Sequence, residues 1–166
     1  MSRVKWQILG GNMRVEELNI ADLIPHSGGS VLLDSIIFAD NVSIKCALKV
    51  KENQRYVDAQ GVETLVSLEW MAQAVAVFSG LEKRRQALES DRGDVKPRRG
   101  MLISCRQLDL HLPKINIDDE LEIVARMDHR SGDIAAFSCQ VFRGKDCLAE
   151  GILNVYEGEL DDPEKN

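Results

Sequence analysis

The chain has 166 residues, a formal charge of −6 at pH 7 and a pI of about 5.1. The length is that of one domain, and the acidic balance argues against a general binder of nucleic acid or of anionic membranes. We expect a single domain over residues 1–157, followed by an acidic tail over residues 158–166 that frays.

The N-terminal residues contain no apolar stretch of the signal-peptide kind, and we expect a cytoplasmic protein without a membrane span. The four cysteines are not spaced as C-x-x-C, and no histidine cluster accompanies them. Such cysteines are typical of free thiols in a reducing compartment. The sequence therefore predicts no metal site and no cofactor.

The first half of the chain predicts a hairpin that follows a loop. Residues 20–24 favour a short helical turn, and the Pro, Gly and Ser content of residues 24–30 indicates a loop. Residues 31–38 are rich in β-formers, and residues 42–50 alternate between apolar and polar side chains. The turn at residues 39–41 would join these two strands.

Residues 65–81, LVSLEWMAQAVAVFSGL, are apolar almost throughout, which predicts a helix buried on most sides. The helix should continue to about residue 86, where charged residues take over. Glu69 and Gln73 are four residues apart, so they lie one turn from each other on one face. A carboxylate in such apolar surroundings needs a partner or a function, because isolated charge is expensive to bury.

The second half of the chain predicts a run of strands separated by turns. A loop at residues 90–99 precedes four alternating segments, at residues 100–112, 121–127, 134–142 and 147–156. Short connections favour an antiparallel sheet rather than βαβ units. The fold class is therefore α+β, with an antiparallel sheet wrapped around one long buried helix, and a second copy of the chain is the simplest cover for any exposed flank of that helix.

This arrangement resembles the hotdog fold, and three motifs are similar to those of the 3-hydroxyacyl-acyl-carrier-protein dehydratases. Ile24-Pro25-His26 resembles their leucine-proline-histidine opening, and Gly100-Met101-Leu102 resembles the start of their long third strand. Glu69-Trp70-Met71-Ala72-Gln73 resembles their helix motif Glu-x-Met-Ala-Gln, in which the glutamate is catalytic. The similarity runs from about residue 20 to residue 156, and the most similar subgroup is the divergent dehydratase-like proteins of aryl-polyene-type pathways.

One departure from that family concerns its second catalytic group. The standard enzymes carry a catalytic histidine ahead of the helix, whereas residues 55–64 here contain none. The histidines of this chain are His26, His111 and His129. His26 is the best candidate for the missing role, because its Pro/Gly/Ser loop is a common setting for catalytic groups. The alternative is a loop residue that only fixes the hairpin, and His111 is better explained by exposure or by a cross-strand pair.

The resemblance implies dehydration of a 3-hydroxyacyl thioester of acyl carrier protein by a homodimer or larger homo-oligomer, with Glu69 and His26 as catalytic residues. Gln73 would orient Glu69 or a water. Backbone amides beginning at Thr64 and Leu65 would polarise the thioester carbonyl. Two alternatives stay open, namely a hotdog thioesterase whose helix carboxylate activates water, and a non-catalytic acyl-binding subunit that supports another hotdog protein.

Overall fold

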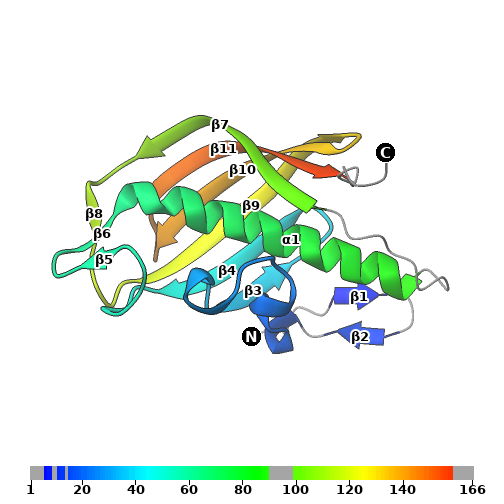
Figure 1. The fold of residues 1–166 in the computed structure, drawn as a ribbon, viewed down its shortest axis with the longest axis horizontal. Helices are drawn as coiled ribbons and strands as arrows, with labels where there is room; N and C mark the ends of the chain where they lie inside the picture. Colours follow the sequence, from blue (N-terminus) through cyan, green and yellow to red (C-terminus); the bar gives the residue numbers. More distant parts are fainter. Residues whose placement is uncertain (1–5, 9–10, 14, 90–98, 159–166) are drawn as a thin grey trace, which may run out of the picture.

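A computed structural model describes residues 6–8, 11–13, 15–89 and 99–158. Within them, six strands form one antiparallel sheet in the order β3-β4-β9-β10-β11-β7, which curves behind the helix α1 (Figure 1). The strands are β3 (Ser35–Ala39), β4 (Ser43–Lys49), β7 (Arg99–Leu110), β9 (Glu120–Ser131), β10 (Ile134–Arg143) and β11 (Asp146–Gly158). The helix is α1 (Ser67–Glu89), entered through the 3-10 turn η4 (Thr64–Val66).

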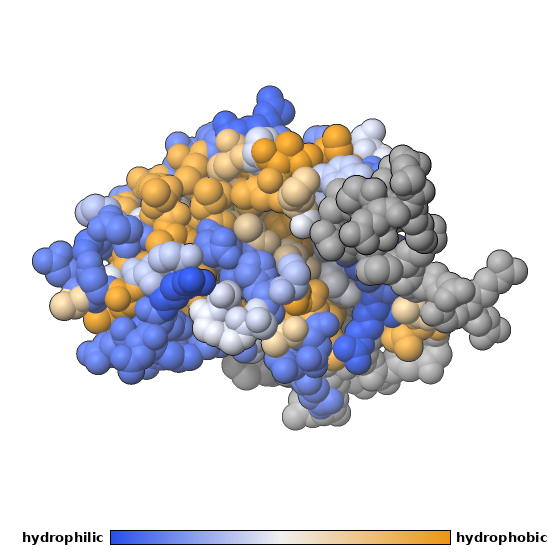
Figure 2. Space-filling model, in the orientation of Figure 1, coloured by the Kyte–Doolittle hydropathy of each residue, from blue (hydrophilic) through white to orange (hydrophobic). Residues whose placement is uncertain are grey.

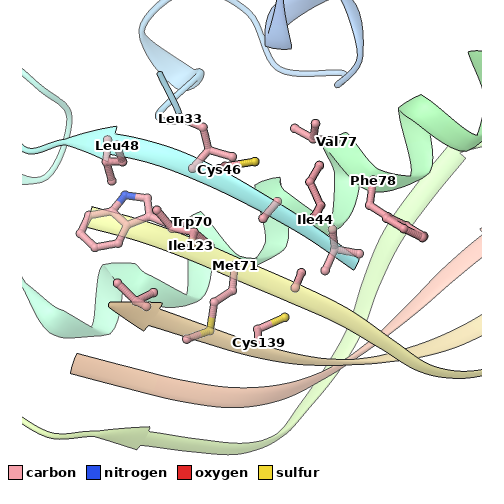
Figure 3. Packing of buried hydrophobic residues seen from close by; sticks show 14 of the residues in the cluster. Leu33, Ile44, Cys46, Leu48, Trp70, Met71, Val77, Phe78, Ile123 and Cys139 are labelled. Atoms are coloured by element: carbon pink, nitrogen blue, oxygen red, sulfur yellow. The ribbon is translucent and has the colours of Figure 1, made fainter. Parts of the chain in front are cut away.

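Alternation along the strands places their apolar side chains against α1. In β4 every second residue is buried, beginning with Ile44, and the same holds for β9 from Leu121 to Ala125. Figure 3 shows side chains of the helix packed among those of the strands. The rings of Phe78 in α1 and Phe137 in β10 meet edge to face, with centroids 5.6 Å apart. The expected sheet around a buried helix is therefore confirmed.

Two parts of the fold differ from the sequence-based expectations. The strand expected at residues 31–38 begins only at Ser35, because Leu32 and Leu33 are already buried as loop residues in the core. Ahead of the helix, where no strand was expected, the chain forms two short strands, β5 (Val57–Asp58) and β6 (Gly61–Glu63). They form a small second sheet with β8 (Lys114–Ile115), which was not expected. This small sheet leads directly into the N-terminus of α1.

The N-terminal segment forms short elements that lie beside the helix (Figure 1). A hairpin of β1 (Trp6–Ile8) and β2 (Gly11–Met13) is followed by the 3-10 turns η1 (Val15–Glu17), η2 (Ile20–Asp22) and η3 (Gly28–Ser30). The turn η2 confirms the helical turn expected near residue 20. The loop expected at residues 90–99 lies, except for Arg99, outside the described residues, and so does the tail beyond Gly158.

By length and composition, the segment Thr64–Leu88 could also pass for a membrane-spanning helix. However, 61% of its most apolar stretch is buried inside the protein. Burial against the sheet accounts for the apolar character of α1, as expected for the core helix of an α+β domain.

Apolar surface gathers over β7 and the N-terminal half of α1 (Figure 2). Met101 and Ile103 in β7 are 56% and 51% exposed, and Leu65 at the start of the helix is 59% exposed. β7 is also an edge strand of the sheet, so one row of its backbone hydrogen-bonding groups faces no neighbouring strand among the described residues.

Candidate active site

Glu69 lies in the first turn of α1, where the helix dipole favours a negative charge. Its side chain is 41% exposed in the single chain, so it is less buried than the apolar residues around it in the sequence suggested. The carboxylate instead stands at a cavity. A carboxylate in this position can be reached by a ligand without first being released from the core.

Gln73 lies one turn further along the same face and is fully buried. Its Nε2 donates to Glu69 Oε1 and to Ser30 O, each at 2.8 Å, and its Oε1 accepts from the backbone N–H of Leu32 at 2.9 Å. Gln73 does not line the cavity among the described residues, and its expected role in substrate binding stays a prediction. It orients Glu69 and ties the segment around η3 to the helix.

His26 meets Glu69 within the same chain. The distance from His26 Nε2 to Glu69 Oε1 is 3.4 Å, and the His26 side chain is 32% exposed. The pair therefore forms within one chain, without a residue from a second copy. The other ring nitrogen, Nδ1, is buried and has no hydrogen-bond partner among the described residues. Nε2 is therefore the nitrogen that can exchange a proton with a ligand in the cavity.

A close approach of backbone to helix holds His26 in place. Gly80 packs under Leu23, and a Cβ at residue 80 would lie only 2.2 Å from Leu23 O. The absence of a side chain at Gly80 thus lets the segment from η2 to His26 lie directly on α1. From there Pro25 and His26 reach the rim of the cavity beside Glu69.

The cavity has a volume of about 570 Å³, in the range of small-molecule sites. It lies between α1, the segment at residues 23–26, the start of β7 and the end of β11. Besides His26 and Glu69, its walls are mostly small or apolar and include Ala72, Val75, Ala76, Leu102 and Val155. This combination of one acid–base pair and an apolar channel suits a ligand with a reactive polar head and an aliphatic chain.

The expected roles of Thr64 and Leu65 are not supported by their positions. Neither residue lines the cavity within the part of the chain that the structure describes. Thr64 is fully buried, and its backbone N–H already donates to Pro113 O at 3.0 Å. Leu65 points to the surface. Of the expected site residues, the structure therefore places Glu69 and His26 at the cavity and Gln73 directly behind Glu69.

Sequence reasoning missed the polar end of the cavity, which Ser79, Lys83 and Glu157 line. Glu157 stands at an inward-facing position of β11, two residues after the buried Val155. An acidic residue at an apolar position of the alternation in β11 was the signal that could have identified Glu157.

Outside the cavity, His111 Nε2 lies 3.5 Å from Glu150 Oε1, as expected for a cross-strand pair. No group of metal-ligating side chains occurs among the described residues.

Solved structures confirm the fold. The dehydratase heterocomplex ApeI:P from Xenorhabdus doucetiae matches with a TM-score of 0.74 and 22% identity, over 86% of this chain and 92% of that chain. The PaaI protein of E. coli, from a phenylacetic acid degradation operon, matches with a TM-score of 0.55 and 14% identity, over 73% and 80% of the two chains. A hypothetical thioesterase with coenzyme A from Streptococcus pneumoniae TIGR4 matches with a TM-score of 0.56 and 11% identity, over 75% of this chain and 86% of that chain.

No curated protein sequence matches the chain. The family model described as ApeP dehydratase, however, matches residues 18–165, which is nearly the whole chain. That span includes the segment carrying His26, the helix motif from Glu69 to Gln73, and every strand of the large sheet. The protein therefore belongs to the ApeP-like dehydratase family and has the hotdog fold.

Proposed function

We propose that the protein dehydrates 3-hydroxyacyl thioesters of acyl carrier protein, in fatty-acid or polyene-type biosynthesis in the cytoplasm. The observation that carries this proposal is the pair of His26 and Glu69 at the rim of an apolar cavity, 3.4 Å apart. Membership of a dehydratase family supports the reaction class.

The reaction needs one base and one acid, and the pair supplies both. A base removes a proton from C2, the bond between C3 and its hydroxyl breaks, and a C2–C3 double bond forms. The departing hydroxyl takes up one proton and leaves as water, so no redox partner is needed. Glu69 Oε1 is shared between Gln73 and His26, which leaves Oε2 for the substrate. One member of the pair takes the C2 proton and the other protonates the hydroxyl.

Basic residues gather toward the C-terminal end of α1, at the end of the cavity opposite Glu69. Lys83, Arg84 and Arg85 follow one another there, on a protein that is acidic overall. Arg84 is exposed, whereas Arg85 is bonded to Asn41 Oδ1 at 2.7 Å. A local positive field there would attract an acidic carrier protein during the encounter, whereas the carrier would dock at the Glu69 end of the cavity, where its thioester reacts.

The exposed apolar surface over β7 supports assembly with a second hotdog chain. An edge strand with large exposed side chains is a template for pairing with another strand. We expect a homodimer, as inferred from the sequence, and propose that its interface runs along β7. The similar structure of ApeI:P is a heterocomplex of that protein, which makes a different hotdog chain the alternative partner. The mass of the purified protein in solution tests this: a dimer supports self-pairing, and a monomer contradicts it.

Thioester hydrolysis is the second candidate reaction. A similar fold occurs in a hypothetical thioesterase, and Glu69 alone could activate a water beside a thioester carbonyl. Dehydration is favoured because His26 supplies the second proton-transfer group that hydrolysis by a single carboxylate does not require.

The deciding experiment offers the purified protein 3-hydroxyacyl and saturated acyl conjugates of acyl carrier protein and follows them by mass spectrometry. Loss of one water from the 3-hydroxyacyl conjugate, with no change in the saturated one, supports dehydration. Release of free carrier thiol from either conjugate shows a thioesterase. Neither product at high protein concentration contradicts both reactions and favours the non-catalytic subunit.

A further inference from the structure

The cavity has a second polar end, far from the acid–base pair. Glu69 and Ser79 both line it, and they are ten residues apart on α1, which corresponds to about 15 Å along the helix axis. Between them the helix contributes only Ala72, Val75 and Ala76 to the wall. An extended acyl chain whose reactive end lies at Glu69 would therefore run along this wall toward Ser79.

A buried carboxylate closes that end. Glu157 is only 6% exposed and still lines the cavity. It accepts a hydrogen bond from Ser79 Oγ and another from Arg130 Nη2, the latter at 3.0 Å. The same Arg130 nitrogen also lies 2.8 Å from Glu82 Oε2. The Glu157 carboxylate is thus fixed from two sides, by the helix and by β9.

A purely aliphatic chain suits this end poorly. A carboxylate has about four acceptor sites, and the described contacts of Glu157 use two of them. A methyl group placed against it would displace water without replacing a hydrogen bond, which leaves a polar group desolvated. A hydroxyl group can donate to the carboxylate or to Ser79 and would restore that bond. Sites built to bond a hydroxyl discriminate strongly against ligands that lack it.

We propose that Glu157 and Ser79 form a recognition subsite for a hydroxyl group at the far end of the acyl chain. This inference rests on the proposed function, since it takes the chain to enter with its thioester at Glu69. Lys83 lies at the same end and would favour a carboxylate tip instead, but it is less buried than Glu157. The more deeply buried group is acidic, so the subsite selects a donor rather than an anion.

The test measures binding and needs no turnover. Thioether analogues of acyl-pantetheine are prepared as a chain-length series, each with a methyl, a hydroxyl or a carboxylate tip, and titrated calorimetrically into the full-length protein. At the best-fitting length we expect the hydroxyl-tipped analogue to bind at least about tenfold more tightly than the methyl-tipped one. Glu157→Gln and Ser79→Ala should each reduce that ratio several-fold. Glu69→Gln is the matched control and should leave it unchanged.

Equal or tighter binding of the methyl-tipped or the carboxylate-tipped analogue would overturn the subsite, as would a ratio unaffected by both far-end variants. If Glu157→Gln does not fold, Ser79→Ala decides, because it leaves the ion pair between Arg130 and Glu157 in place. A hydroxyl preference without any dehydration would support the subsite and contradict the proposed reaction. Dehydration without a preference for the hydroxyl tip would support the proposed reaction and contradict the subsite.

Discussion

Replacing Gln73 by leucine tests whether this buried amide holds the site together. The variant loses three hydrogen bonds and leaves the N–H of Leu32 and the carbonyl of Ser30 without their partner. Each such group costs about 1–3 kcal/mol when it stays unsatisfied, and the apolar replacement regains part of that. We therefore expect a loss of about 3 kcal/mol in the free energy of unfolding.

Urea denaturation followed by circular dichroism measures this loss. With a slope of about 2 kcal/mol per M, the midpoint should fall by about 1.5 M. Turnover of a 3-hydroxyacyl conjugate should fall by about a hundredfold, because Glu69 loses the group that orients it. The matched control is Gln140→Leu, whose side chain makes a single long bond of 3.4 Å to Glu150 and should change stability by less than about 0.5 kcal/mol. A fall in the urea midpoint for Gln73→Leu as small as that of the control would contradict the role of Gln73 in holding the site together.

Three further changes have definite expected outcomes. His26→Asn should lower turnover at least about a hundredfold with little change in KM, measured by steady-state kinetics; wild-type turnover would remove His26 from the acid–base pair. Gly80→Ala should destabilise the protein by about 1–3 kcal/mol in urea denaturation although alanine favours helix, because its Cβ would lie 2.2 Å from Leu23 O; higher stability would contradict the close packing. Burial raises the pKa of Cys46 from 9.0 to about 12, so above pH 9 the unfolded thiol ionises while the folded one keeps its proton. Stability should therefore fall by about 1.4 kcal/mol per pH unit between these values, and the fall should be shallower in Cys46→Ala; equal slopes would show that the thiol is not buried.

The helix and its strands could be predicted because their patterns are long and regular. The apolar run before Lys83 and the alternation at Ile44 or Leu121 each extend over several residues, so burial on one side follows directly from spacing. The neighbouring positions of Glu69 and Gln73 followed from helical geometry and are confirmed by their 2.8 Å contact.

The meeting of His26 with Glu69 inside one chain could not be predicted in the same way. It depends on the contact between Gly80 and Leu23, which joins segments far apart in the sequence. Neither the glycine nor the leucine indicates that contact in the sequence, because a glycine within a helix can have several explanations. The two-residue strand β8 is too short to carry a pattern, and the position of Glu157 required knowing which face of β11 turns toward the cavity.

The central claim is that the Glu69 carboxylate carries the chemistry, and the most direct measurement compares wild-type protein with Glu69→Gln on one 3-hydroxyacyl carrier conjugate. The amide keeps the size of the side chain and can still bond Gln73, so folding and analogue binding should be retained. Formation of the unsaturated thioester should fall by at least about a thousandfold in the variant. A rate within a few-fold of wild type would contradict it.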